Sequence, residues 1–257
     1  MKMKNITQIL LVVLTGAGFS QSALELGESA FKNRAIGSVE DKAAPSPIEN
    51  AISHLEEALK NPKVEKEAAL ALMKCVYFHG KFIGENEKAQ KKSFQKGKDL
   101  GEKYISEYPN SAPFRYWYLV NLGSWSEVYG ILTAAKEGVA DLMKDHSEKI
   151  IALDPQYEDG GGYFMLGAVH YKSPYIPFLL SWPDNDDAII WLEKSVETGA
   201  ATPNQKFYLG QAYYKGKKVD SAISILEEVA TMAPSNNRPV EDWEQIKKAK
   251  NLLKEYR

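Results

Sequence analysis

The apolar positions of residues 204–234 follow the spacing of two amphipathic helices joined by a short turn. Gly210 stands on the first helix, and Ala222 and Leu226 share one face of the second. Small residues let two helices approach closely, and a large apolar side chain fills the seam between them. Pro234 ends the second helix, because proline has no N–H to donate. The pattern predicts an antiparallel helical hairpin.

The same pattern recurs along the chain. Moving back 34 residues places Ala188 and Leu192 where Ala222 and Leu226 stand. The partner helix of this second copy carries Leu166-Gly167, and an earlier copy covers residues 50–59. Proline-containing repeat ends recur as well. We therefore expect about four stacked hairpins, followed by a last helix over 239–256.

This spacing resembles the tetratricopeptide repeat, a helix–turn–helix unit that buries its apolar face by stacking on its neighbours. The predicted fold class is all-α, with antiparallel helical hairpins stacked as degenerate tetratricopeptide-like repeats. The last helix is expected to act as a C-terminal cap, because such arrays need one polar outer face at each end.

Three segments depart from a simple repeat. Residues 88–108 form a helix rich in lysine, which we interpret as a solvated face because acidic residues are interspersed with the lysines. Residues 134–153 are expected to form one helix. The insertion 172–183 holds three prolines and several aromatic residues. An apolar loop of this kind is expected to cover a groove or meet a partner.

The N-terminus has the composition of a targeting segment. Lys2 and Lys4 precede a short apolar run over residues 6–14. The run is too short to span a bilayer, so residues 1–20 are predicted to be a cleaved secretory signal peptide. An uncleaved anchor is the alternative. No cysteine lies near the predicted cut, so the lipoprotein route is not supported, and residues 21–257 are predicted to form one repeat domain.

Composition argues against several function classes. The formal net charge is −2, and no concentrated basic face indicates a nucleic-acid partner. The four histidines are scattered without metal-ligand spacing, so neither a metal nor a cofactor is expected. Cys75 lies in an apolar helix and is interpreted as an inert core thiol. Because no acid–base or nucleophile constellation is visible, the chain is not expected to be an enzyme.

Binding is the better expectation. In a hairpin array the first helix of each hairpin lines the concave side, and aromatic walls with a few polar groups suit a small ligand. The residues predicted to bind a ligand there are Arg115, Trp117, Asn121, Trp125, Tyr163, His170, Tyr171 and, from the insertion, Trp182. The alternative is that these side chains are ordinary repeat core.

One family resemblance is more specific. The stretch Gly161-Gly162-Tyr163-Phe164-Met165-Leu166-Gly167, followed by the insertion ending Trp182-Pro183-Asp184, resembles the T component of tripartite ATP-independent periplasmic (TRAP) transporters. The resemblance implies a periplasmic protein that binds a solute-binding protein, holds a small hydrophobic or organic-acid ligand, forms a homotrimer and meets the membrane only indirectly. The alternative is a secreted scaffold for envelope protein assembly without a ligand of its own.

Overall fold

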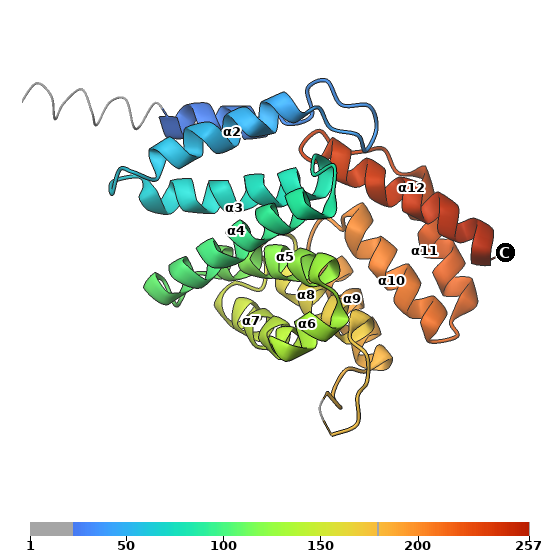
Figure 1. Cartoon of the computed structure of the whole chain (residues 1–257). Helices are drawn as coiled ribbons and strands as arrows, with labels where there is room; N and C mark the ends of the chain where they lie inside the picture. The colour runs from blue at the N-terminus through green and yellow to red at the C-terminus, as the bar shows by residue number, and fades with distance from the viewer. Residues whose placement is uncertain (1–22, 179, 257) are drawn as a thin grey trace, which may run out of the picture.

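The computed structural model describes residues 23–178 and 180–256 of the chain. Over these residues the regular structure is helical, apart from two isolated β-bridges. The helices form antiparallel hairpins that stack in sequence order (Figure 1). This confirms the predicted fold class. The predicted signal peptide, 1–20, lies outside the described residues.

The hairpins follow one another with short connections. The first pairs a helical stretch over 23–32 with α2 (Pro45–Ala58). The next are α3 (Glu65–Phe82) with α4 (Glu87–Glu107), α5 (Ala112–Tyr129) with α7 (Val139–Leu153), α8 (Gly161–Lys172) with α9 (Asn185–Thr198), and α10 (Pro203–Lys215) with α11 (Val219–Thr231). The short α6 (Ile131–Lys136) connects α5 to α7, and α12 (Pro239–Tyr256) comes last.

Glycine–leucine contacts hold three of these hairpins together. A Cβ atom added at the glycine would lie 2.6 to 2.8 Å from the leucine Cγ in each of the pairs Gly27–Leu55, Gly167–Leu192 and Gly210–Leu226. These are the glycine and leucine positions of the repeating pattern. Their contact in space shows that the pattern encodes the seam inside a hairpin.

The predicted helix 134–153 is interrupted. The structure ends α6 at Lys136 and begins α7 at Val139. Gly138 between them has φ of 64°, a left-handed conformation that glycine adopts without steric cost. A helix cannot continue through this residue, so the connection bends and α6 lies apart from the axis of α7.

The last helix does more than cap the final hairpin. As expected, α12 packs on α11 through Ala249 and Leu253. Its first turns also reach the opposite end of the array, where Val240 is buried in the cluster of the first two hairpins. Arg34 makes a 2.7 Å ion pair with Glu241 across the same junction. In Figure 1 the start of α12 lies beside the N-terminal loop, so the stacked array closes on itself.

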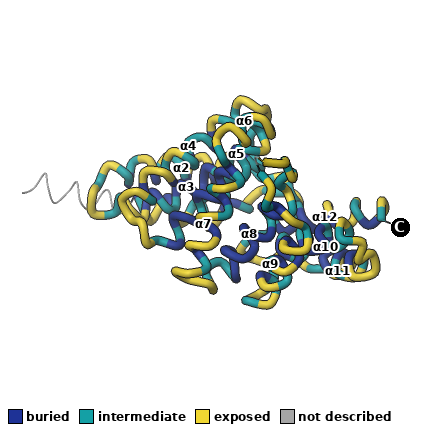
Figure 2. The backbone as a smooth tube through the Cα atoms, turned by 90° about the horizontal axis from the view of Figure 1, so that it is seen from below, coloured by how far each residue is buried: buried dark blue, intermediate teal, exposed yellow. Residues whose placement is uncertain are grey.

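The insertion between α8 and α9 forms a small loop. Ile176 and Leu180 bond to each other through backbone atoms at 2.8 Å. Phe178 at its tip is fully exposed, whereas Trp182 at its base donates a 2.8 Å hydrogen bond to Asp141. Figure 2 shows the buried residues along the middle of the molecule and the exposed ones in the loops.

Candidate functional site

A cavity of about 1110 Å³, partly open to solvent, lies between the helices of the array. Helices from both ends of the chain line it, namely α3, α5, α6, α7, α8, α10 and α12. Small-molecule sites typically have volumes of about 300–1000 Å³, so this cavity is slightly larger than that range.

One wall of the cavity is apolar. Val120 of α5 and Phe164, Met165 and Val169 of α8 line it, and Met143 of α7 extends it. Ile176 and Leu180 of the insertion lie at one edge of this wall. The insertion thus contributes to the cavity through the sides of its loop, while its tip stays outside.

The other wall is polar, and most of its charges are paired. Lys248 lies 2.8 Å from Glu244 on α12, and Lys172 and Glu127, on the α8 and α5 helices of the apolar wall, lie 2.5 Å apart. Lys81 of α3 reaches Glu244 at 3.3 Å, which joins α3 to α12 across the cavity. Because these carboxylates have cationic neighbours, the wall is polar without a large net charge.

Three tyrosines from different helices meet the cavity: Tyr77, Tyr116 and Tyr208. Burial raises the pKa of Tyr77 well above its usual value, and the charges of Glu244 and Glu241 raise it further. Burial also raises the pKa of Tyr116 and of Tyr208. The three hydroxyls therefore stay neutral and serve as hydrogen-bonding groups between the apolar and polar walls.

Among the eight residues predicted to bind a ligand, Trp117 is in the cavity wall. Its ring lies 6.1 Å from Tyr77 and 5.6 Å from Tyr116, and Lys74 sits over it at 5.4 Å. Of the predicted set, this side chain is the one placed to meet a ligand in the cavity.

The other predicted residues of α5 pack between helices. Arg115 is buried and donates to the Pro109 carbonyl at 2.6 Å. Asn121 is fully buried and donates to the Met73 carbonyl at 3.2 Å. Trp125 donates to Gln95 on α4 at 2.6 Å. None of the three is in the cavity wall, which agrees with the core alternative.

The remaining predicted residues lie on α8 and in the insertion, and they face away from the cavity. Tyr163 stacks on Trp191 at 6.0 Å. His170 accepts a 3.3 Å hydrogen bond from the Asp184 N–H and packs edge-on against Trp182. Tyr171 packs edge-on against Tyr208. These residues hold the insertion and α10 in place, and none lines the cavity.

The sequence missed most of the cavity wall because helix phase was misjudged. On α5 the cavity face runs through Tyr116, Val120, Gly123 and Glu127, at the spacing of one helical face. Most of the predicted residues of α5 lie instead on the adjacent face of the helix, which packs against α4 and α7. A search for the face that combines polar and apolar residues would have found the cavity face.

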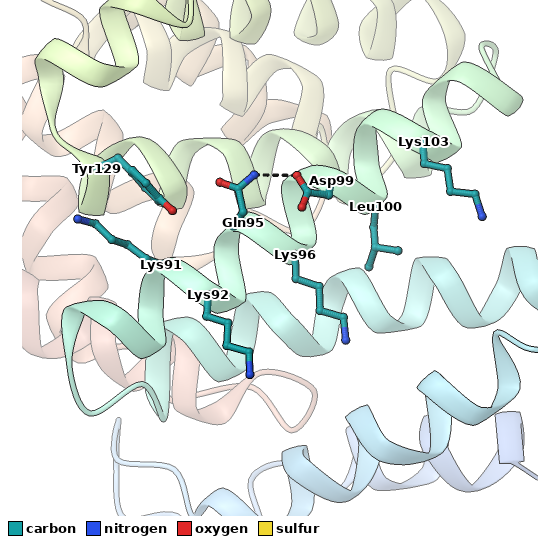
Figure 3. Close-up of a pocket in the computed structure, with 8 residues that line it drawn as sticks. All are labelled: Lys91, Lys92, Gln95, Lys96, Asp99, Leu100, Lys103 and Tyr129. Atoms are coloured by element: carbon teal, nitrogen blue, oxygen red, sulfur yellow. Dashed lines mark hydrogen bonds between the residues drawn. The ribbon is translucent and has the colours of Figure 1, made fainter.

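A second, shallower groove lies on α4. Figure 3 shows Lys91, Lys92, Lys96 and Lys103 along it, beside Tyr129. Three of these lysines have acidic partners: Lys91 with Glu87, Lys96 with Glu56, and Lys103 with Glu65. The groove therefore matches the expected solvated face more closely than an unneutralised basic patch.

Metal-binding clusters and membrane-spanning helices are both missing from the described residues. Over 23–178 and 180–256, no group of three or more histidine, cysteine or acidic side chains is arranged to hold a metal ion. Within the same residues, every helix is too short or too polar to cross a membrane. Cys75 is buried, and burial raises the pKa of its thiol, as expected for an inert core residue.

Comparison with solved structures supports the fold. A crystal structure of a thermophilic tetratricopeptide-repeat protein from Thermus thermophilus superimposes with a TM-score of 0.58. The match covers 92% of this chain and 96% of that one, at 16% sequence identity. At this identity the likeness concerns the fold alone.

Comparison with curated sequences identifies relatives. The rat protein described as regulator of microtubule dynamics protein 3 is 29% identical over 131 residues, which is 51% of this chain and 26% of the rat protein. The mouse protein of the same description is 27% identical over 134 residues. The chain therefore spans about a quarter of the length of the curated relatives it matches.

These findings overturn the resemblance to the TRAP transporter T component. The glycines on which it depended have a packing role, because a Cβ would lie 2.4 Å from Tyr116 at Gly161 and 2.6 Å from Leu192 at Gly167. Glycines of this kind are expected wherever helical hairpins stack closely. The transporter role, and the periplasmic setting that it implied, are therefore wrong, because residues 40–179 match the profile of a different family. The solute-binding protein partner and the homotrimer were implied by that resemblance alone and lose their support with it.

The profile of one family matches residues 40–179, which is more than half of the chain and includes the glycine-rich start of α8. The chain belongs to the family described as regulator of microtubule dynamics protein 1-3.

Proposed function

We propose that this chain is a binding protein that encloses an amphipathic small molecule in its central cavity. The closure of the array by α12 carries the proposal. The cavity is partly open to solvent, and its volume of about 1110 Å³ suits a small ligand and is too small for a folded partner. No catalytic role is part of the proposal.

The two walls support an amphipathic ligand in particular. The apolar wall of α5 and α8 favours a long apolar portion, whose burial is worth about 25 cal/mol per Å² of surface. The paired charges of α3 and α12 favour a polar end, since these groups remain hydrated when the cavity is empty. A purely apolar ligand would displace that hydration without replacing its hydrogen bonds.

The test uses the neutral dye N-phenyl-1-naphthylamine, whose emission rises in apolar surroundings. We expect the wild-type protein to bind the dye with saturation at one site. Replacing Ser124 in the cavity wall by leucine fills part of the cavity and should weaken dye binding about tenfold. Ser53→Leu on the exposed face of α2 is the matched control and should leave dye binding unchanged. Equal binding by both variants would contradict the proposal.

A second candidate function is docking of an acidic protein surface on α4. Lys92, which has no ion-pair partner among the described residues of the α4 groove, favours it, and α4 lies inside the segment shared with the regulators of microtubule dynamics. We would measure co-sedimentation of the full chain with microtubules at rising salt. Binding that falls with salt and is lost in Lys92→Glu/Lys96→Glu, but kept in Lys60→Glu, would support it. Absence of co-sedimentation at low salt would exclude microtubules as the partner.

A further inference from the structure

Three hydrogen-bond donors in the cavity wall have no hydrogen-bond or ion-pair partner among the described residues. They are the Lys74 ammonium and the Tyr77 hydroxyl, both on α3, and the Tyr116 hydroxyl on α5. None of the three is among the side-chain atoms that are sealed from solvent without a partner, so each has accessible surface. A ligand in the cavity can therefore reach all three donors.

The Trp117 ring is the common neighbour of these donors. Its centroid lies 6.1 Å from that of the Tyr77 ring and 5.6 Å from that of the Tyr116 ring. The Lys74 Nζ atom lies over the same ring, 5.4 Å from its centroid. Lys74 and Tyr77 are three residues apart on α3, which places them on one face of that helix. The three donors therefore gather around one part of the wall.

The chemistry of these groups selects a ligand group that accepts hydrogen bonds. An ammonium group has three donors and no acceptor. Burial raises the pKa of Tyr77 and of Tyr116, so both hydroxyls keep their protons and remain able to donate. A carboxylate has two oxygens with about four lone-pair sites, so one carboxylate can accept from all three donors.

The charges of the wall leave one cation unmatched. Within the described residues, each of the other cations that line the cavity has an acidic partner: Arg34 with Glu241, Lys81 and Lys248 with Glu244, Lys172 with Glu127, and Arg238 with Glu158 and Asp159. Lys74 has none in the same part of the chain. A ligand with a single negative charge would supply the missing partner.

One acid of the wall, Asp242, also lacks a cationic partner among the described residues. It accepts from the Ser235 N–H at 2.8 Å and is only 5% exposed, so its charge is engaged by the loop that precedes α12. An ammonium ligand would therefore meet the free charge of Lys74 without gaining an available carboxylate. A phosphate monoester carries about 1.5 to 2 negative charges, which is more than one lysine neutralises.

We infer that the polar end of the enclosed ligand is a carboxylate, which accepts from Lys74, Tyr77 and Tyr116 beside the Trp117 ring. The inference rests on the proposed function, because it assigns the ligand class of the same cavity. The ligand class is thus an organic acid with one carboxylate and a long apolar portion, which lies along the apolar wall of α5 and α8.

The experiment compares four probes with the same apolar chain and different heads. They are octanoate, octyl phosphate, octyl glucoside and octylammonium, each used below its micelle concentration to displace N-phenyl-1-naphthylamine. We expect octanoate to bind about tenfold more tightly than each of the others, because charge-assisted hydrogen bonds are the strong ones. Equal binding of all four, or tighter binding of any other probe, would overturn the inference and leave the cavity-binding function standing. Failure of the dye and of all four probes to bind would instead contradict the proposed function.

A pair of lysine variants on α3 locates the effect. Lys74→Met keeps the length of the side chain and removes its charge, so it should weaken octanoate about tenfold and leave octyl glucoside unchanged. Lys66→Met is the matched control, because Lys66 is exposed, lies over the Tyr108 ring at 4.7 Å and is not in the cavity wall. This control should bind octanoate as the wild-type protein does. Equal octanoate binding by the two variants would overturn the inference.

A tyrosine variant tests the hydroxyls separately from the charge. Tyr77→Phe keeps the ring beside Trp117 and removes one donor, so it should weaken octanoate about threefold and leave octylammonium unchanged. Circular dichroism checks the fold of each variant, and Lys74→Gln takes the place of Lys74→Met if that protein does not fold. An octanoate affinity that Tyr77→Phe leaves unchanged would show that the carboxylate does not lie at this donor cluster.

Discussion

Two faces of the same helix, α5, have opposite roles. On one face Asn121, Trp125 and Tyr118 pack against α4 and α7 and are almost completely buried. On the other face Tyr116, Val120 and Gly123 line the cavity. Both faces are rich in apolar and aromatic residues. Their difference lies in what they face: a neighbouring helix on one side and open space on the other.

The contacts of each face explain the difference. Gly97 of α4 lets Asn121 approach so closely that its amide donates to the Met73 carbonyl of α3. On the cavity face a Cβ added at Gly123 would have one neighbouring atom within 4 Å, Met143 Cε of α7 at 3.8 Å. A residue on the packed face therefore contributes to stability, and one on the cavity face is available for a ligand.

Two glycine substitutions test this contrast with the largest expected effect. A Cβ at Gly97 would lie 2.0 Å from Asn121 Oδ1, and Asn121 cannot move without losing buried hydrogen bonds. Gly97→Ala should therefore lower the free energy of unfolding by about 3 kcal/mol. Gly123→Ala meets only an ordinary contact and should raise it by about 0.5–1 kcal/mol. Urea denaturation measures both, and similar losses in the two variants would contradict the assignment of the faces.

The contact between Arg34 and Glu241 joins the N-terminal hairpin to α12 and so forms one side of the cavity. Arg34 is 7% exposed in its side chain, bonds to Glu241 and to the Asn237 carbonyl, and lies over the Phe31 ring. Arg34→Met leaves Glu241 without its partner, and we expect a loss of about 2 kcal/mol. Amide hydrogen exchange should also accelerate in the first turns of α12.

A surface ion pair provides the control for the closure. Lys60 and Glu57 lie 2.5 Å apart with 71% and 46% of their side chains exposed. Lys60→Met should change the free energy of unfolding by less than about 0.5 kcal/mol, because exposed pairs contribute little. If Arg34→Met cost no more than this control, α12 would not be holding the array closed.

The seams within hairpins were predictable and the cavity was not. The pairs Gly167–Leu192 and Gly210–Leu226 recur at a fixed spacing, so the sequence reveals them directly. The closure joins Arg34 to Glu241 across 207 positions and repeats nowhere in the described part of the chain. It depends on the accumulated turn of every hairpin between them, which no local pattern encodes.

Helix phase on α8 shows the same limit. Residues 161–167 are buried all round the helix, so their apolar pattern does not distinguish the cavity side from the packed side. The glycine-rich stretch was therefore interpreted as a mark of a transporter family, whereas the structure gives it a packing role shared by close-packed hairpins. Among the predicted ligand-binding residues, Trp117 lies in the cavity wall and the others do not.

A smaller change in stability is expected when the pH is lowered, at the contact between α7 and the packed face of α5. Arg115 and His146 Nδ1 are 2.8 Å apart, and burial together with the Arg115 charge lowers the pKa of His146 to about 4. In the unfolded chain the imidazole takes up a proton near pH 6.5, while in the folded chain it stays neutral down to about pH 4. Stability is therefore lost as pH falls from about 6.5 to 4, by on the order of 1–2 kcal/mol for this half-buried group.

Comparison with a variant isolates this contribution. His146→Asn keeps a polar side chain and has no proton to take up in this range. The pH dependence of its thermal midpoint between about pH 4 and 6.5 should be flatter than that of the wild-type protein. Parallel curves for the two proteins would show that His146 titrates alike in the folded and unfolded states.

The smallest expected change in stability belongs to the cavity face itself. Ser124 lines the cavity, and its hydroxyl donates to the Val120 carbonyl of the preceding turn at 2.9 Å. Ser124→Leu adds volume where no helix lies opposite and replaces serine by a better helix former. The free energy of unfolding should therefore change by less than about 0.5 kcal/mol, measured in urea. The same enlargement on the packed face would overpack a filled seam. A loss above about 1 kcal/mol would mean that protein side chains already fill the space beside Ser124. An unchanged stability combined with weaker dye binding would separate the role of the cavity face from that of the packed face within a single helix.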